Sequence, residues 1–320
     1  MIPVLVTGMN SVTAISIVKG LRQQAELLLH IVGTDTNLKN EIAGSSFCDQ
    51  FYTVPKAVED NYISQLVDIC VAENVKIIFP VVDIELEIIA TNIEVFRNQG
   101  IQVWLSNLET IQTCNNKYQT YKFFLDHKFA TPQTWLPEEI TGREADFPYP
   151  LIVKPIDGRS SIDVFCVEDV AALQQALKKV NQPIIQEYLE GKEFTIDVVA
   201  DEDSRILAVV PRERIEIKAG ISYKGRTVKD QQLIEKATDI AQKLQIKGAC
   251  NIQCRVKDNL VKFFEVNPRF SGTLPLTIAA GVNSPLLLVK LALGQNLEKE
   301  YFDFKEGLYM ARYWQEVFYE

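Results

Sequence analysis

The sequence predicts an α/β domain followed by a mixed α+β region. Residues 1–110 alternate apolar strand patterns with helical patterns, which is typical of βαβ units and a parallel sheet. Beyond about residue 110, strands follow one another directly and helices come between groups of them. A chain of 320 residues is long enough for about two domains of roughly 150 residues each. We therefore expect an N-terminal Rossmann-like domain joined to a second, mixed architecture.

The elements of the first region follow from local periodicity. A buried strand pattern at 3–7 leads through Gly8 into a helical pattern. We expect strands at 3–7, 28–33, 76–82 and 102–105, and helices at 12–21, 62–73 and 85–96.

The second region starts with a helix and continues with strands of varied length. We expect helices at 117–129, 169–180, 231–244 and 277–293, the last broken at 283–285. We expect strands at 151–155, 163–167, 184–188, 193–200, 206–211, 249–256 and 260–266.

Composition narrows the classes of function. The net charge of −9 makes non-specific nucleic-acid binding a poor interpretation, although a local cationic pocket for phosphates remains open. No apolar run reaches the length of a membrane span, and the N-terminus lacks the basic region of a signal peptide, so we expect a cytoplasmic protein. Only two histidines are present, which excludes a multi-histidine metal centre within one chain.

The segment 248–272 is the most informative part of the sequence. Along its first strand, Asn251, Gln253 and Arg255 alternate with apolar residues. If Gln253 faces Glu265 across an antiparallel hairpin, the numbers of any two paired residues add up to 518. This register pairs Lys257 with Val261 and leaves 258–260 as a three-residue loop. Asn251 then faces Asn267.

This register collects the oxygen ligands of Gln253, Glu265 and Asn267 on one face. A carboxylate and carboxamides, completed by substrate phosphates, suit Mg²⁺. Arg269 adds a cation two residues on, and Pro268 ends the donation of ladder hydrogen bonds there. A solvent-facing strand with ordinary polar residues is the alternative.

Two upstream segments have less specific patterns. Lys154 ends an apolar strand and precedes a small, hydroxyl-rich loop, which suits phosphate but also an ordinary surface turn. The loop is not a Walker A motif. The segment 186–193 has the pattern of an extended stretch that can offer backbone groups to an adenine, or of a plain turn between strands.

In their order, these motifs resemble the ATP-grasp superfamily, most closely the synthetase halves of the carbamoyl-phosphate synthase large subunit and their stand-alone ligase relatives. The resemblance covers nearly the whole chain and is strongest over 248–294. It implies an N-terminal Rossmann-like pre-ATP-grasp domain (1–110), a small lobe with the linking helix and phosphate loop (111–186), and a large lobe with the metal and nucleotide site (187–320). The cofactors implied are ATP and Mg²⁺, with Mn²⁺ as the alternative ion.

The resemblance also implies roles for individual residues. Lys154 and Arg269 act in catalysis, and Gln253, Glu265 and Asn267 hold the divalent ions. The implied nucleotide contacts are Lys117, Lys154, Gly158, Ser160, Ser161, Glu187, Tyr188, Leu189 and Glu193. The loop at 158–161 is poorer in glycine than is usual in the family. The way in which this loop would contact the phosphates is therefore the implied feature with the least support.

The implied reaction is ATP-dependent ligation. A substrate carboxylate attacks the γ-phosphorus of ATP, and an amine or thiol then displaces phosphate from the acyl-phosphate. The expected partners are a small carboxylate and a small amine, with no nucleic acid and no membrane, and the sequence is compatible with a homodimer. For the substrates we select Arg214 and Arg226 as anion contacts, and Asp83 and Glu85 as amine contacts or as helix-capping groups.

Three other functions remain to be weighed. One is a component of a split carbamoyl-phosphate-synthase-like enzyme acting on bicarbonate or carbamate; we favour the ligase because 309–320 does not look like a linker. Another is a non-catalytic ATP sensor, which the complete set of Glu265, Asn267 and Arg269 argues against. A dinucleotide-dependent oxidoreductase is disfavoured, because the loop after Gly8 lacks the glycines that admit a pyrophosphate.

Overall fold

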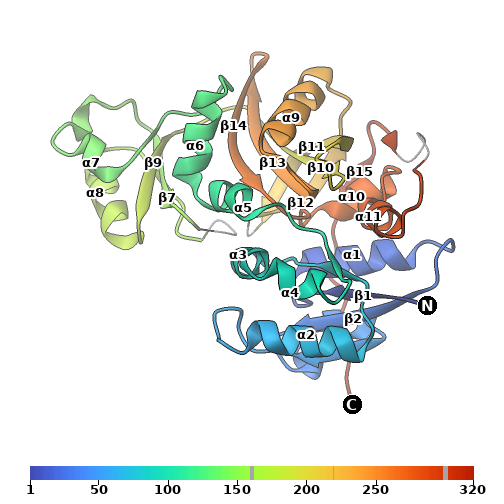
Figure 1. The fold of residues 1–320 in the computed structure, drawn as a ribbon. Helices are drawn as coiled ribbons and strands as arrows, with labels where there is room; N and C mark the ends of the chain where they lie inside the picture. The colour runs from blue at the N-terminus through green and yellow to red at the C-terminus, as the bar shows by residue number, and fades with distance from the viewer. Residues whose placement is uncertain (159–161, 219, 298–301) are drawn as a thin grey trace.

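A computed structural model describes residues 1–158, 162–218, 220–297 and 302–320. The described residues form three sheets (Figure 1). Within the described residues, none of the helices combines the length and apolar character needed to cross a bilayer.

The N-terminal sheet is fully parallel, with strand order β3-β2-β1-β4-β5. Its elements are β1 (Ile2–Val6), α1 (Val12–Arg22), β2 (Leu29–Asp35), β3 (Gln50–Thr53), α2 (Tyr62–Ala72), β4 (Ile77–Phe79), α3 (Asp83–Thr91), α4 (Ile93–Arg97) and β5 (Gln102–Val103), with 3₁₀ turns at Lys39–Glu41 and Ala43–Phe47. The chain leaves β1 towards β2 on one side and later returns to β4 on the other. The sheet therefore has a topological switch point between β1 and β4, where ligands bind in open α/β sheets.

The middle region carries a small antiparallel sheet in the order β6-β9-β7-β8. Its elements are α5 (Leu108–Asn115), α6 (Lys117–Asp126), β6 (Thr134–Trp135), α7 (Pro137–Ile140), a 3₁₀ turn (Glu144–Asp146), β7 (Leu151–Pro155), β8 (Phe165–Val167), α8 (Val170–Lys179) and β9 (Pro183–Glu187). An apolar cluster that includes Leu151, Val153 and Leu173 fixes α8 against one face of this sheet.

The largest sheet is antiparallel, in the order β14-β13-β10-β11-β12-β15. Its elements are β10 (Lys192–Ala200), β11 (Ile206–Lys218), β12 (Ile221–Thr227), α9 (Gln231–Lys243), β13 (Gly248–Lys257), β14 (Leu260–Asn267), α10 (Leu274–Ala279), α11 (Ser284–Ala292) and β15 (Tyr309–Ala311). Helix α9 covers one face through Leu233, Ala237 and Ile240. The opposite face is left for the cleft.

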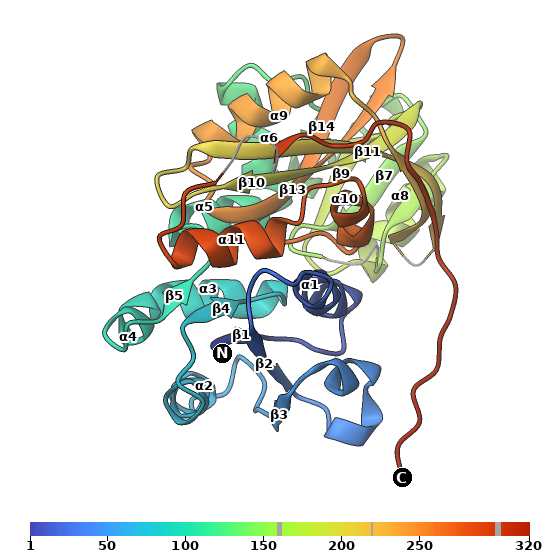
Figure 2. The same cartoon turned by 90° about the vertical axis from the view of Figure 1, so that its right-hand side faces the viewer.

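The N-terminal sheet is joined to the large lobe by a shared core. Ile17 of α1 and Val4 of β1 belong to the same apolar cluster as Leu287 and Leu288 of α11. The C-terminal segment then runs back beside the N-terminal domain (Figure 2), where the Tyr319 hydroxyl donates to the Ile42 carbonyl at 2.9 Å. The expected fold class is thereby confirmed, whereas the domain boundaries at 110 and 186 stay a prediction.

Several elements differ from the sequence expectations. The strand expected at 76–82 is limited to β4, and the helix expected at 85–96 begins at Asp83 and breaks at Asn92 into α3 and α4. Strand β11 continues to Lys218 because it pairs with β12 there, with Glu213 and Glu216 forming ion pairs to Arg226 and Lys224 on that strand. The elements β3, α5, β12 and β15 were not expected from their short or polar patterns.

A buried ion pair ties the large sheet to the turn that follows β14. The Arg212 guanidinium is almost fully buried, pairs with Asp197 of β10, and donates to the Ser271 hydroxyl at 2.7 Å and the Thr273 carbonyl at 3.1 Å. Thr277 of α10 donates to the same Asp197 carboxylate at 2.5 Å. This network holds 271–273 against the floor of the cleft.

Replacing Arg212 should therefore be costly. We expect Arg212→Ala to lower the free energy of unfolding by about 3–5 kcal/mol, because Asp197 would stay buried without its cation. Arg205→Ala is the control, since the exposed Arg205 pairs with Asp201 at the surface and should contribute less than about 1 kcal/mol. Urea unfolding of both variants gives the comparison; equal losses would contradict the structural role of Arg212.

Candidate functional site

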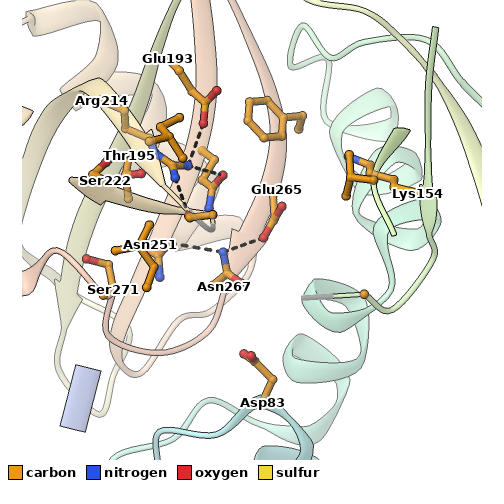
Figure 3. Close-up of a pocket in the computed structure, with 18 of the residues that line it drawn as sticks. Asp83, Lys154, Glu193, Thr195, Arg214, Ser222, Asn251, Glu265, Asn267 and Ser271 are labelled. Carbon is orange, nitrogen blue, oxygen red and sulfur yellow. Dashed lines mark hydrogen bonds and ion pairs between the residues drawn. The ribbon is translucent and has the colours of Figure 1, made fainter. Parts of the chain in front are cut away.

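The three sheets enclose one large cleft with a volume of about 700 Å³. Its walls come from β7 and β9 of the small sheet, the exposed face of the large sheet, and the loops at the carboxyl end of the N-terminal sheet. Figure 3 shows Lys154 on one side of this space, facing Glu265 and Asn267 on the other, with Asp83 below them. A cleft of this size is in the range of small-molecule sites.

The pairing of β13 with β14 determines what the large sheet presents to the cleft. Asn251 pairs with Asn267 and Gln253 with Glu265, as the sequence predicts. Beyond Gln253 a β-bulge shifts the register by one residue. The hairpin loop is consequently shortened to Asp258 and Asn259, which both have positive φ angles, instead of the expected three-residue loop.

The bulge also places two consecutive side chains on the same side. Phe263 is fully buried in the core under α9, whereas Phe264 and Glu265 both line the cleft. The Lys154 ammonium lies 5.6 Å from the centre of the Phe264 ring. The bulge thus gives the cleft an aromatic surface next to the carboxylate.

Glu265 and Asn267 form the oxygen-rich part of the cleft. The Asn267 amide nitrogen donates to a Glu265 carboxylate oxygen at 3.0 Å and to the Asn251 side-chain oxygen at 3.3 Å. Within the part of the chain that the structure describes, Glu265 has no direct ion pair, although the charges of Lys154, Arg214 and Arg269 lie near enough to interact with it across the cleft. A carboxylate and a carboxamide so arranged are hard ligands that fit a Mg²⁺ ion completed by phosphate oxygens and water.

Gln253 fits such an ion less well. Its side-chain oxygen accepts a hydrogen bond from Arg214 at 3.2 Å, so a guanidinium lies beside it. Among the described residues, no group of three or more His, Cys, Asp or Glu side chains could hold a metal. Any divalent ion here would depend on Glu265, its amide neighbours and the ligands that a substrate brings.

Two buried lysines lie on the small-sheet side. The Lys154 ammonium on β7 donates to the Gln186 side chain at 2.8 Å and, among the described residues, has no ion pair. Burial lowers the pKa of Lys154 to about 8, with Lys117 adding to this effect and Glu265 opposing it. Lys117, at the start of α6, donates to the Gly158 carbonyl. Both cations line the cleft, as does Gly158, while Ser160 and Ser161 lie outside the described residues.

The end of β9 and the residues that follow it form another part of the cleft wall. Glu187, Tyr188 and Leu189 all line it. The Glu187 side chain pairs with Lys262 at 2.6 Å, and the Leu189 carbonyl accepts from Arg255 at 2.7 Å. In the described chain neither the Tyr188 N–H nor the Leu189 N–H has a hydrogen-bond partner, so both are available to a ligand.

Glu193 on β10 is held between two arginines. Its carboxylate oxygens accept from Arg214 at 2.7 Å and from Arg255 at 2.8 Å. Arg214 is nearly buried, and it is fixed further by the Ser222 hydroxyl at 3.1 Å and the Gly220 carbonyl at 2.6 Å. Arg255 of β13 and Thr195 of β10 also line the cleft, and the sequence analysis did not select them as site residues. The alternation of side chains along each strand was the signal that could have identified them.

Arg269 connects the cleft to the N-terminal domain. Its Nε and Nη2 atoms donate to the two Asp83 carboxylate oxygens at 2.7 and 3.1 Å, and Nη1 donates to the Phe270 carbonyl at 3.0 Å. Although burial disfavours its charge, the Asp83 carboxylate raises the pKa of Arg269. Asp83 thus lines the cleft with its carboxylate already paired to a guanidinium, and its contact with an amine stays a prediction.

Two of the substrate residues selected from the sequence do not reach the cleft. Glu85 is buried inside the N-terminal domain, where it accepts from the Tyr62 hydroxyl at 2.7 Å and from the backbone of Val81 and Val82 at 2.9 Å. Burial raises its pKa. Glu85 therefore caps the entrance of α3, and its expected contact with an amine is corrected.

Arg226 lies on the face of the large sheet that points away from the cleft. It pairs across strands with Glu213, whose neighbours Arg212 and Arg214 point the other way. The two arginines selected from the sequence are consequently separated: Arg214 lines the cleft, and Arg226 is exposed on the opposite face.

Three family models match successive parts of the chain. They are described as "PylC-like, N-terminal domain" over residues 4–104, "D-ala D-ala ligase C-terminus" over 116–224 and "ATP-grasp in the biosynthetic pathway with Ter operon" over 179–315. Each of these models covers less than half of the chain, and together they make it similar to ATP-grasp ligases along most of its length.

Curated relatives of the chain include carbamoyl phosphate synthase large chains. The arginine-specific carbamoyl phosphate synthase large chain of Geobacillus stearothermophilus is 33% identical over 50% of this chain and 16% of its own length. The corresponding large chain of Bacillus subtilis is 25% identical over 88% of this chain and 28% of its own length. The chain therefore spans less than a third of either relative.

Solved structures agree on the fold at low sequence identity. A biotin carboxylase from Campylobacter jejuni, in a β-γ-ATP complex, superimposes with a TM-score of 0.76 at 15% identity, covering 96% of this chain and 74% of that one. A biotin carboxylase domain dimer from Hydrogenobacter thermophilus with MgADP gives 0.73 at 15% identity, covering 96% and 73%. An L-amino acid ligase from Bacillus licheniformis gives 0.70 at 17% identity, covering 94% and 76%.

The buried Lys154 leads to a prediction about stability. Because its folded-state pKa is about 8, below the ordinary value of 10.5, the unfolded chain binds more protons between these values. Burial of the charged lysine thus lowers stability below pH 8, and this cost is relieved as the pH rises towards 10.5. We expect Lys154→Met to raise the free energy of unfolding at pH 7 by roughly 1–3 kcal/mol.

Urea unfolding at pH 7 and at pH 10 tests this expectation. The advantage of Lys154→Met should shrink at the higher pH, while the exposed substitution Lys178→Met should have little effect at either pH. A stability difference that is absent at pH 7, or that does not change with pH, would contradict the buried cationic state of Lys154.

Proposed function

We propose that the protein is an ATP-dependent ligase that activates a carboxylate as an acyl-phosphate and transfers the acyl group to an amine. The observation that carries the proposal is the facing of a buried, unpaired lysine and an unpaired carboxylate across one cleft, within the described residues. A phosphate chain with a divalent ion complements both groups at once, because its oxygens meet Lys154 while the ion meets Glu265.

The nucleotide is assigned to the end of the cleft near β9. We assign the adenine edge to the backbone of Glu187 and Leu189, the two residues on either side of Tyr188. Glu193 lies further along the same wall and accepts ribose hydroxyls in this arrangement, with Arg214 and Arg255 fixing the orientation of its carboxylate. Lys154 and Lys117, with the loop that begins at Gly158, bind the phosphates.

Mg²⁺, with Mn²⁺ as the alternative, would be held by Glu265 and Asn267, and when bound it would neutralise charge on the phosphate oxygens. Gln253 is a weaker candidate because of its hydrogen bond to Arg214. The MgADP found in the H. thermophilus neighbour supports this pairing of nucleotide and ion.

The cations of the chain then stabilise the transferred phosphoryl group. A substrate carboxylate oxygen forms a bond to the γ-phosphorus as the bond to ADP breaks, and Lys154 and Arg269 offset the negative charge in the transition state. The amine next attacks the acyl carbon, phosphate leaves, and the amine loses a proton to solvent. This chemistry needs no enzyme nucleophile, which suits a cleft whose described lining contains neither cysteine nor histidine.

A second candidate is the activation of bicarbonate or carbamate as part of a carbamoyl-phosphate-synthase-like assembly. It is favoured by the curated relatives, which are carbamoyl phosphate synthase large chains. Bicarbonate-dependent ADP release with ammonia would select this reaction over amide formation between two organic substrates. The dimeric H. thermophilus neighbour supports a homodimer, which light scattering would test.

Removing the Glu265 charge should abolish turnover. We expect Glu265→Gln to lower ADP release by about 100-fold or more, because a group that organises charge in the transition state is lost. The assay would supply MgATP with pairs of amino acids, and separately with bicarbonate and ammonia. The control is Glu216→Gln, which removes an exposed carboxylate from β11 that pairs with Lys218 and Lys224.

Wild-type release of ADP that depends on a carboxylate substrate would support an enzyme. If the protein binds nucleotide but releases no ADP with any of the substrate pairs tested, the result would favour the sensor function instead. Full activity of Glu265→Gln would overturn the site assignment.

A further inference from the structure

The cleft extends beyond the nucleotide site to the switch point of the N-terminal sheet. The loop after β1 and the first turn of α1 contribute residues 10–13 to its lining. The loop after β4 and the first residue of α3 contribute residues 81–83. These two loops flank the point at which the strand order reverses. Open α/β sheets bind ligands at such a point, yet nothing assigned to the nucleotide lies there.

The start of α1 presents unused hydrogen-bond donors to this part of the cleft. The cap residue Ser11 satisfies the Ala14 N–H with its side chain at 3.1 Å, and its carbonyl accepts from Ile15 at 3.2 Å. The N–H groups of Val12 and Thr13 have no partner among the described residues. The first turn of α1 contains no acidic residue, so the positive end of the helix is not neutralised by its own side chains.

Thr13 provides an independent indication. Its side chain is only 6% exposed, it lines the cleft, and its hydroxyl makes no hydrogen bond within the described residues. The Thr13 oxygen is not among the fully enclosed side-chain atoms that lack a partner, so it keeps access to the cleft and is available to a ligand there. The hydroxyl faces Gly272, where a Cβ atom would lie 3.8 Å from the Thr13 oxygen and 3.3 Å from Val12.

The charges around this region favour an anion. Arg312 donates to the Gly272 carbonyl, and Arg212 lies buried under Ser271 and Thr273. The two nearby carboxylates are already occupied: Asp83 binds Arg269, and Asp35 accepts from the Asn10 N–H at 2.7 Å and from Asn37. Two cations therefore lie next to this part of the cleft, and both nearby carboxylates already accept hydrogen bonds.

We propose that the first turn of α1, with the Thr13 hydroxyl, binds a second anionic group, a carboxylate or a phosphate, on one of the two ligase substrates. This inference rests on the proposed function and narrows its substrate class. One substrate carries a negative group that takes no part in the reaction, and this group orients the reacting end towards Arg269 and the nucleotide.

The experiment uses the full chain saturated with MgADP, so that the nucleotide phosphates already occupy the lysine side of the cleft. Sodium phosphate and sodium succinate are titrated separately into protein labelled with ¹⁵N-valine and ¹⁵N-threonine. The amide signals of Val12 and Thr13 are assigned by Val12→Ile and Thr13→Ser. We expect these two signals to shift saturably, and the anion with the lower dissociation constant identifies the group as phosphate or carboxylate.

Thr13→Val tests the hydroxyl without changing the side-chain shape. It should weaken anion binding by roughly tenfold, because a hydrogen bond to a charged group is lost. Thr238→Val on α9 is the matched control and should leave the affinity unchanged. Val12→Glu is a second variant, in which a carboxylate added at the exposed first position of α1 should also weaken anion binding.

The outcomes separate this inference from the proposed function. Val12 and Thr13 signals that do not move with either anion, or an affinity that Thr13→Val leaves unchanged, would overturn the subsite. ADP binding is measured in the same samples. If ADP fails to bind, the proposed function fails, and titration of the nucleotide-free protein still decides whether the subsite exists.

Discussion

The antiparallel pairing of β13 with β14 is the constraint on which the cleft depends. Strand alternation sends Cys250, Ile252 and Cys254 into the core under α9, so the intervening polar residues must face the cleft. The bulge after Gln253 then adds one side chain to that face without moving Phe263 out of the core. Without the bulge, strict alternation along β14 from Glu265 would turn Phe263 towards the cleft and Phe264 towards the core under α9.

The cleft keeps opposite charges close without letting them pair. Lys154 belongs to the small sheet and Glu265 to the large sheet, and each keeps neutral hydrogen-bond partners, Gln186 and Asn267. Elsewhere the site pairs its charges firmly, as in Glu193 with its two arginines and Arg269 with Asp83. The unpaired groups are consequently the ones free to bind a phosphate chain and a divalent ion, and the paired groups give the cleft its rigid shape.

Local patterns predicted more of the hairpin than of its surroundings. The polar alternation and the pairing of Gln253 with Glu265 follow from a period of two residues, but two adjacent phenylalanines do not reveal which one leaves the core. The opposite orientations of Arg214 and Arg226 depend on β11 continuing past Pro211, which its charged residues concealed. The burial of Glu85 depends on Tyr62, a partner that no local pattern identifies. Lys117 was assigned through family resemblance alone, and the segment at 187–189 had only a pattern that a plain turn between strands also fits.

The most direct test of the account is calorimetric titration of ADP into the wild-type protein with Mg²⁺ and with a chelator, alongside Lys154→Met. The account predicts saturable binding with Mg²⁺ that weakens about tenfold or more when either the ion or the lysine is removed, because each loss deletes a charge-assisted contact to phosphate. ADP binding that depends on neither Mg²⁺ nor Lys154 would contradict the claim that the two lobes hold a metal–nucleotide complex between them.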